Sequence, residues 1–121
     1  MAIRVRRIYE KPTDRDGARV LVDRLWPRGV SKTMARIDYW AKEIAPGNAL
    51  RKWFHEDRKR NWTAFQKKYR AELLEKRKSL IALRSRFGKS FTMVTAAKDI
   101  ERSHIPILRK ILSSKRRNQA K

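Results

Sequence analysis

Apolar and polar positions along the chain follow two periods, one typical of strands and one typical of helices. Three short apolar runs predict strands, at residues 3–9, 19–25 and 91–97. The uninterrupted Val20, Leu21 and Val22 indicate a central strand with both faces buried. Because these runs alternate with helical segments, the pattern predicts an α/β fold, a single-domain layered sandwich with a small, at least partly parallel sheet flanked by helices.

The clearest helical segment spans residues 62–87. Its apolar stripe, which recurs about every 3.6 residues, consists of Trp62, Phe65, Tyr69, Leu73, Leu80, Leu83 and Phe87. Lys76 interrupts the stripe, so we expect a break over residues 76–79 in which Ser79 caps a second helix. Gly88 is expected to end that helix, because glycine readily adopts the left-handed conformation found after helices.

Capping residues predict three further helices. Ser31 can cap a short helix that runs toward Arg36, and Asn48 can cap the next one. Ser103 is the expected cap of a last helix, whose apolar side is formed by Ile105, Leu108, Ile111 and Leu112. Residues 37–44 fit both helical and strand spacing; the period slightly favours a helix, with a short strand as the alternative.

Two polar segments are expected to be connections between these elements. Residues 11–17 combine proline, two aspartates and a glycine, and residues 26–29 contain a proline that cannot continue a central strand. The basic residues 113–121 offer almost no apolar surface for packing. We therefore expect one domain over residues 1–112, followed by a basic flexible tail over residues 113–121.

Charged residues follow two of the predicted strands at the point where each strand ends. Asp23 and Arg24 follow the buried run, and Lys98 and Asp99 follow the third strand. Because ligands bind at the carboxyl ends of parallel strands, both pairs are expected at one edge of the sheet. His104 would face the same edge, where the N–H groups at the start of the last helix favour an anion.

This edge permits several kinds of site. Asp23 or Asp99 is suited to act as a base, or to orient His104 for acid–base chemistry. The alternative is a structural ion-pair network in which Asp23 pairs with Arg24 or Lys98 and binds no ligand. The side chains suited to hold a phosphate or carboxylate are Arg24, Arg28 and Lys98. The two histidines lack metal-ligand spacing, so neither a metal site nor a cofactor is predicted.

Net charge adds a second candidate function. The chain has 33 lysines and arginines against 12 acidic residues, which gives a formal charge of +21, and most of the excess lies in residues 61–121. A polyanion neutralises such an excess best, because phosphate contacts release counterions. The sequence therefore predicts a nucleic-acid-binding protein with low sequence specificity, with DNA favoured over RNA. An enzyme or small-anion binder at the strand ends is the alternative.

The basic residues expected to contact phosphates share positions off the apolar stripe, in the loop at residues 26–29 or in the tail. They are Arg28, Lys67, Lys68, Arg70, Arg77, Lys78, Arg84, Arg86, Lys89, Lys115, Arg116 and Arg117. A basic surface with another purpose and an anionic membrane surface are the alternatives. The sequence has no cysteine, no signal-peptide pattern and no apolar run near the ~18 residues that cross a bilayer. These features predict a cytoplasmic protein, and they leave its oligomeric state open.

Several motifs resemble the YeaO-like family, small bacterial and archaeal proteins classed as a domain of unknown function. They are VDRLWPRGVSK at residues 22–32, AP and LRKWFH at residues 45–46 and 50–55, and AAKD at residues 96–99 followed by His104. The resemblance covers roughly residues 3–112 and implies an α/β sandwich, with no established reaction to carry over. It also implies signature positions at the strand ends, namely Asp23, Arg24, Trp26, Arg28, Lys98, Asp99 and His104.

The chain departs from the family pattern beside these signature positions. Thr95 stands where a tyrosine usually precedes the AAKD motif, and Ser103 and Ile105 flank His104 where asparagine and alanine are typical. The resemblance therefore implies that any ligand contact made by the tyrosine or asparagine is lost or altered in this chain.

Overall fold

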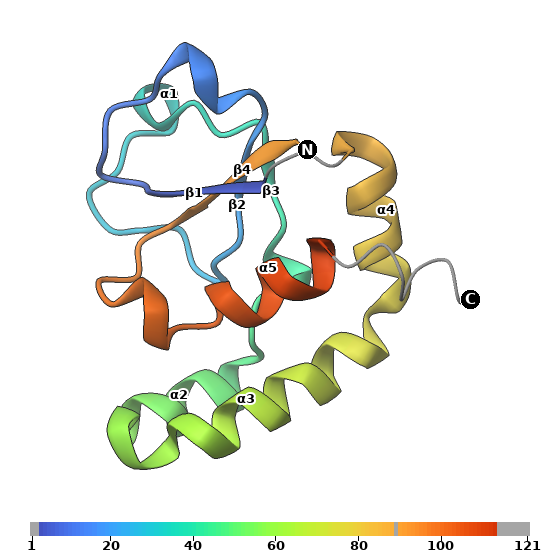
Figure 1. Cartoon of the computed structure of the whole chain (residues 1–121). Helices are drawn as coiled ribbons and strands as arrows, with labels where there is room; N and C mark the ends of the chain where they lie inside the picture. Colours follow the sequence, from blue (N-terminus) through green and yellow to red (C-terminus); the bar gives the residue numbers. More distant parts are fainter. Residues whose placement is uncertain (1–2, 89, 114–121) are drawn as a thin grey trace.

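Four strands form a parallel sheet in the computed structural model, which describes residues 3–88 and 90–113 (Figure 1). The strands are β1 (Ile3–Arg7), β2 (Arg19–Leu21), β3 (Tyr39–Trp40) and β4 (Phe91–Thr95). The α-helices are α1 (Lys32–Ala35), α2 (Asn48–Glu56), α3 (Arg58–Glu75), α4 (Arg77–Phe87) and α5 (Ile105–Ser113). Short 3₁₀ helices occur at η1 (Asp14–Asp16), η2 (Lys42–Ile44) and η3 (Ile100–Arg102).

The sheet order is β1-β4-β2-β3, and every neighbouring pair is parallel. This confirms the α/β prediction and extends it, because the sequence indicated only a partly parallel sheet. Val20 of β2 pairs with Met93 of β4 and with Tyr39 of β3, which makes β2 a central strand, as predicted. The carboxyl ends of β1, β2 and β4 therefore point to one edge.

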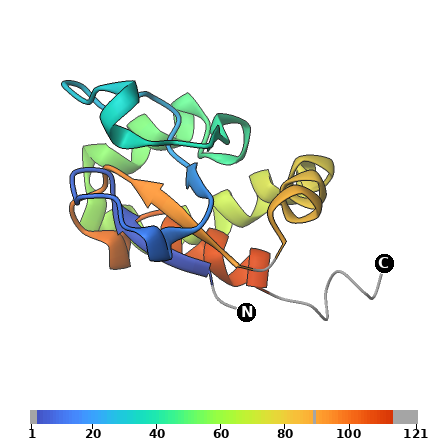
Figure 2. The same cartoon turned by 90° about the horizontal axis from the view of Figure 1, so that it is seen from above.

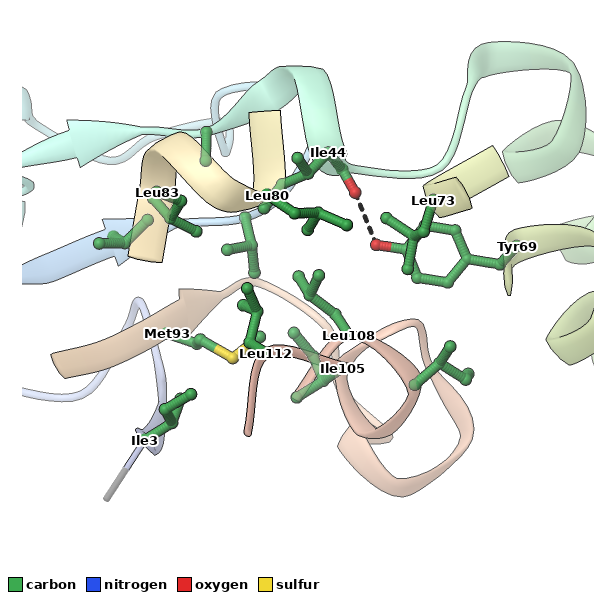
Figure 3. Close-up of a cluster of buried hydrophobic side chains, with 14 of the residues drawn as sticks. Ile3, Ile44, Tyr69, Leu73, Leu80, Leu83, Met93, Ile105, Leu108 and Leu112 are labelled. Atoms are coloured by element: carbon green, nitrogen blue, oxygen red, sulfur yellow. Dashed lines mark hydrogen bonds between the residues drawn. The ribbon is translucent and has the colours of Figure 1, made fainter. Parts of the chain in front are cut away.

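Alternation along the central strands divides the apolar side chains between two cores. Val20 and Met93 face the larger core together with buried residues of α2, α3, α4 and α5 (Figure 3). Leu21 and Val94 face a smaller core on the other side, which includes Ala35 of α1. Both faces of β2 are thus buried, and this explains why its apolar run is continuous.

A buried hydrogen bond joins the longest helix to the segment that follows β3. The Tyr69 hydroxyl donates to the Ile44 carbonyl oxygen at 2.6 Å, and the Tyr69 side chain is fully buried (Figure 3). Burial raises the pKa of this phenol well above its ordinary value, so Tyr69 remains a donor at any physiological pH.

The amino-terminal edge of the sheet is closed by a buried ion pair. The Asp16 carboxylate lies 2.6 Å from the guanidinium of Arg19 and also accepts hydrogen bonds from the backbone and hydroxyl of Thr13. The Asp16 carbonyl accepts from Arg4 and from the Thr92 hydroxyl. At this edge of the sheet, the positive charge of the buried Arg19 is neutralised by the Asp16 carboxylate.

The predicted strands were too long, and one element was assigned to the wrong class. β1, β2 and β4 end at Arg7, Leu21 and Thr95, two to four residues before the predicted ends. The slight preference for a helix over residues 37–44 was wrong, because β3 pairs with β2 and is followed by η2. Cross-strand pairing outweighed the helical spacing of that segment.

The long helical segment was predicted with the correct stripe but the wrong boundaries. It begins at Arg58 rather than residue 62, because the Asp57 carboxylate caps it by accepting from the Arg60 N–H. The break falls at Lys76, and Ser79 lies within α4 rather than at its cap. The ammonium of Lys76 donates to the Glu43 carbonyl at 2.6 Å, which explains how a lysine occupies the apolar stripe.

The capping predictions had mixed outcomes. Ser31 caps α1 by accepting from the Met34 N–H, and Gly88 ends α4 with a positive φ of 70°. Gly47 rather than Asn48 occupies the cap position of α2. The Ser103 hydroxyl accepts from the Ile105 N–H, as expected of a residue at the start of α5. In the described part of the chain, no helix is long and apolar enough to span a bilayer.

Candidate functional site

A cavity of about 550 Å³ opens at the carboxyl ends of the strands. Its wall is formed by residues 23–28 after β2 and 95–98 after β4, together with side chains of α2, the first turn of α3 and the residues just before α5. Parallel sheets commonly bind ligands at this edge. The cavity contains four of the five proposed strand-end residues, Asp23, Arg24, Lys98 and His104.

Asp23 ties together the segments that frame the cavity. One carboxylate oxygen accepts the Thr95 hydroxyl at 2.7 Å, and the other accepts the Ala96 N–H at 2.8 Å. The Nε2 atom of His104 lies 3.4 Å from the first of these oxygens. Asp23 therefore links the ends of β2 and β4 to the start of α5.

The Asp23 carboxylate is stabilised in its ionised form. Burial raises its pKa, but hydrogen bonds from His104, the Ala96 N–H and the Thr95 hydroxyl outweigh burial, so the net pKa lies below its ordinary value. Asp23 is thus an ionised carboxylate that already accepts hydrogen bonds, and its lowered pKa makes it a weak base for abstracting a proton.

The orientation of His104 follows from its partners. Its Nε2 atom lies 2.9 Å from the Val22 carbonyl oxygen, which can only accept, so Nε2 carries a proton. The ring also meets the buried ring of Tyr69 edge to face, with centroids 5.9 Å apart.

Five cationic side chains line the same cavity, and none of them pairs with a carboxylate in the described part of the chain. They are Arg24, Arg28, Arg51, Arg58 and Lys98. Asp23 is the sole acid of the lining, and its partner is His104. The ion pair of Asp23 with Arg24 or Lys98, which was the alternative to a ligand site, is not formed among the described residues.

Two of these arginines are held in place by contacts that leave their charge unneutralised. Arg24 donates to the carbonyl oxygens of residues 45–46, just before α2. Arg58 donates to the Arg102 carbonyl and lies over the Phe54 ring at 5.2 Å. The Nε atom of Arg51 is buried and has no hydrogen-bond partner, as is also true of the Arg6 Nε and Arg19 Nη2 atoms at the amino-terminal edge of the sheet.

The pKa of His55 is lowered by its surroundings. Burial lowers its pKa, and the neighbouring charges of Arg58 and Arg51 lower it further, so the ring is neutral near pH 7. His55 therefore offers a neutral donor or acceptor beside the cationic groups.

The lining also has an apolar part. The rings of Phe54 and Phe65, which stack 4.2 Å apart between centroids, reach the cavity from the core. Tyr9, Leu25 and Trp26 line it from the loops after the strands, and the first two are more than half exposed. The site thus combines fixed cations with aromatic surface.

The other predicted residues are placed elsewhere. Asp99 is exposed, is not part of the cavity wall and precedes η3. Of the proposed phosphate contacts, Arg28 lines the cavity, while Lys89, Lys115, Arg116 and Arg117 lie outside the described residues. The proposed contacts on α3 and α4 that are exposed are Lys67, Lys68, Arg70, Arg77, Lys78 and Arg86. Arg84 is half-buried and donates to the Leu112 carbonyl.

Sequence reasoning missed the contribution of α2 and the start of α3. Arg51 and His55 are spaced i, i+4, and both line the cavity, as does Arg58. Their signal was present in the motif at residues 50–55, which was noted for its resemblance but not assigned to the site. Among the described residues, no cluster of three histidine, aspartate or glutamate side chains could hold a metal ion.

Comparison with known proteins identifies relatives along nearly the whole chain. A family model described as "Inactive DUF488-N3 subclade" matches residues 2–121. An uncharacterized protein of Mycobacterium tuberculosis is 40% identical over 114 residues, covering 93% of this chain and 95% of the relative. The uncharacterized protein YeaO of Escherichia coli is 38% identical over 113 residues, covering 89% and 94%. No solved structure matches the chain.

Replacing Asp23 by asparagine should destabilise the fold at neutral pH by about 1–3 kcal/mol, because one of its donors loses its acceptor. The folded pKa of Asp23 lies below the unfolded value of about 3.9. The contribution of the Asp23 carboxylate to the free energy of unfolding is therefore fully present when the pH is above the unfolded pKa. It is lost as the pH falls through the folded pKa. Urea melts should show the variant and wild type converging over that acidic range. Asp14→Asn, which changes an exposed aspartate, is the control. A difference in stability between Asp23→Asn and wild type that stays constant with pH would contradict this role of Asp23.

Proposed function

The chain belongs to the YeaO-like, DUF488-N3 family, and for this member we propose that the strand-end cavity binds a small organic anion through a phosphate or carboxylate group. The observation that carries the proposal is the cluster of cationic side chains in the cavity wall, which pair with no carboxylate among the described residues. Ionised acceptors form the strongest hydrogen bonds with such groups, and arginine can hold them with two parallel donors.

Several features favour binding over catalysis. The two hydroxyls nearest the charged edge are engaged: Thr95 donates to Asp23 and accepts from the Ala97 N–H, while Ser103 donates to the Ile100 carbonyl. The pKa of Asp23 lies below its ordinary value, so this carboxylate is a weak general base. The matching family model is described as inactive, which agrees with a role in ligand recognition.

Arg51→Gln should weaken binding of inorganic phosphate or sulfate by about tenfold to a hundredfold, the usual effect of losing a hydrogen bond to a charged group. Isothermal titration at low ionic strength provides the measurement. Lys52→Gln is the matched control, because Lys52 is exposed on the same helix and does not line the cavity. Equal binding by the two variants, or no binding by wild type, would exclude this site.

Nucleic acid is the second candidate ligand, and the net charge of +21 favours it. The exposed lysines and arginines of α3 and α4 supply a surface for phosphate contacts. The α4 helix and the turn between α2 and α3 lie at opposite ends of the molecule (Figures 1 and 2). This surface and the cavity are therefore separable by mutation.

Replacing Lys67, Arg70, Arg77 and Lys78 together by glutamine should weaken binding to DNA and RNA probes. The dependence of log affinity on log salt should become shallower by up to about 0.9 for each phosphate contact removed. Fluorescence anisotropy across a salt series measures this slope. Arg51→Gln is the control, and it should leave the slope nearly unchanged for probes that offer only internal phosphates. If the wild-type protein shows no salt-sensitive binding, the nucleic-acid proposal is wrong.

A further inference from the structure

We infer that the anion held in the cavity is the terminal phosphomonoester of a nucleotide, either free or at the phosphorylated end of a nucleic acid strand. This inference rests on the proposed anion site and adds the identity of the rest of the ligand. It draws on the size of the cavity, the distribution of charge in its wall and the aromatic side chains at its mouth.

The cavity is much larger than the anionic group that its cations would hold. A phosphate group has four oxygens, and at the volume of liquid water of about 30 Å³ per oxygen it fills on the order of 100 Å³. The cavity measures about 550 Å³, within the range of sites for larger organic ligands. Room for a further body therefore remains beside the phosphate.

Three of the five lining cations lie toward α2, while Arg28 and Lys98 belong to the loops after β2 and β4. Arg51 belongs to this helix, Arg58 begins α3, and the Arg24 guanidinium is fixed against the carbonyls that precede α2. A terminal phosphomonoester carries a charge of about −1.5 to −2 at pH 7, whereas an internal phosphodiester carries one negative charge. A cluster without internal carboxylate partners favours the more highly charged group.

The apolar side chains of the wall that are open to solvent lie on the loops that follow the strands. Tyr9 and Leu25 are 56% and 57% exposed, and Trp26 is half-buried. The Arg7 guanidinium covers the Tyr9 ring at 5.1 Å, so one face is occupied while the side chain stays open to solvent. Nucleobases bind such surfaces because every base presents a flat face for stacking.

The surroundings of the cavity also fit a nucleotide that continues into a strand. Lys59, Arg60 and Arg102 are exposed and adjoin the lining residues Arg58 and Ser103 in the chain. These side chains could contact neighbouring phosphates while the terminal one occupies the cavity. These exposed basic residues would then bind the same ligand as the cavity.

Isothermal titration with four compounds tests the inference: adenosine monophosphate, ribose 5-phosphate, adenosine and inorganic phosphate. Adenosine monophosphate should bind about 5- to 100-fold more tightly than ribose 5-phosphate, the range expected when one base gains a stacking contact. Adenosine alone should bind weakly. If the two phosphate esters bind equally, the nucleotide inference is wrong while the anion site stands; if no phosphate compound binds, both proposals fail.

The Tyr9→Ala variant tests the aromatic contact. It should reduce the affinity for adenosine monophosphate and leave that for ribose 5-phosphate unchanged, whereas Met34→Ala, an exposed apolar control outside the cavity, should change neither. An unchanged affinity for adenosine monophosphate in Tyr9→Ala would exclude Tyr9 as the stacking surface and overturn the proposed placement of the base.

Oligonucleotides distinguish the two sources of the nucleotide. A short strand with a 5′-phosphate should bind at least about tenfold more tightly than the same strand with a 5′-hydroxyl if strand ends are the ligand, and Arg51→Gln should abolish the difference. If adenosine monophosphate binds tightly but the two strands bind equally, the ligand of the cavity is the free nucleotide. Failure of both the nucleotide and the strand end to exceed ribose 5-phosphate overturns the inference.

Discussion

The arrangement of the candidate site depends on the Asp23 carboxylate. Its bonds to the Thr95 hydroxyl and the Ala96 N–H hold the loops after β2 and β4 at a fixed separation, and its contact with His104 positions the start of α5. A charged acceptor with three donors is stable in a partly buried place, because each donor compensates for lost water. The loops that carry or contact the surrounding arginines are thereby fixed, while Asp23 pairs with His104 and leaves these arginines without a carboxylate partner.

The two edges of the sheet use charge in opposite ways. At the amino-terminal edge, Asp16 pairs with Arg19 and lies near Arg6, so buried cations meet an internal anion. At the carboxyl-terminal edge, the lining arginines have no carboxylate partner among the described residues. Unpaired cations around a cavity contribute little to folding and repel one another. Their presence there is best explained by an external anion that completes the pairing.

Much of the architecture could be predicted from the sequence. The run Val20, Leu21 and Val22 indicated a central strand, and the alternation of strands with helices indicated that Asp23 and Lys98 meet at one edge, as they do. The segment containing Tyr39 was mispredicted because a two-residue strand has too few positions to establish a period. The break at Lys76 fell within the predicted residues 76–79, but Ser79 lies inside α4 instead of capping it. The contact of the Lys76 ammonium with the Glu43 carbonyl could not be predicted, because a tertiary contact carries no local signal.

The partners of charged residues were the least predictable feature. Asp23 pairs with His104, 81 positions along the chain, rather than with the adjacent Arg24, because geometry after folding decides which donor reaches a carboxylate. The roles of Arg51 and Arg58 depend on how α2 and α3 close over the sheet edge. Tyr9 and Leu25 were likewise unassigned, because their exposure matters only beside a cavity that sequence patterns do not reveal.

Backbone amide chemical shifts recorded during titration with adenosine monophosphate test the central claim most directly. The account predicts saturable changes concentrated in residues 23–28, 51–58 and 95–98, which form most of the cavity wall, with small changes on the outer faces of α3 and α4. Changes spread over α3 and α4 that vanish with added salt, with the cavity segments unaffected, would contradict it and leave only diffuse binding of anions to a basic surface.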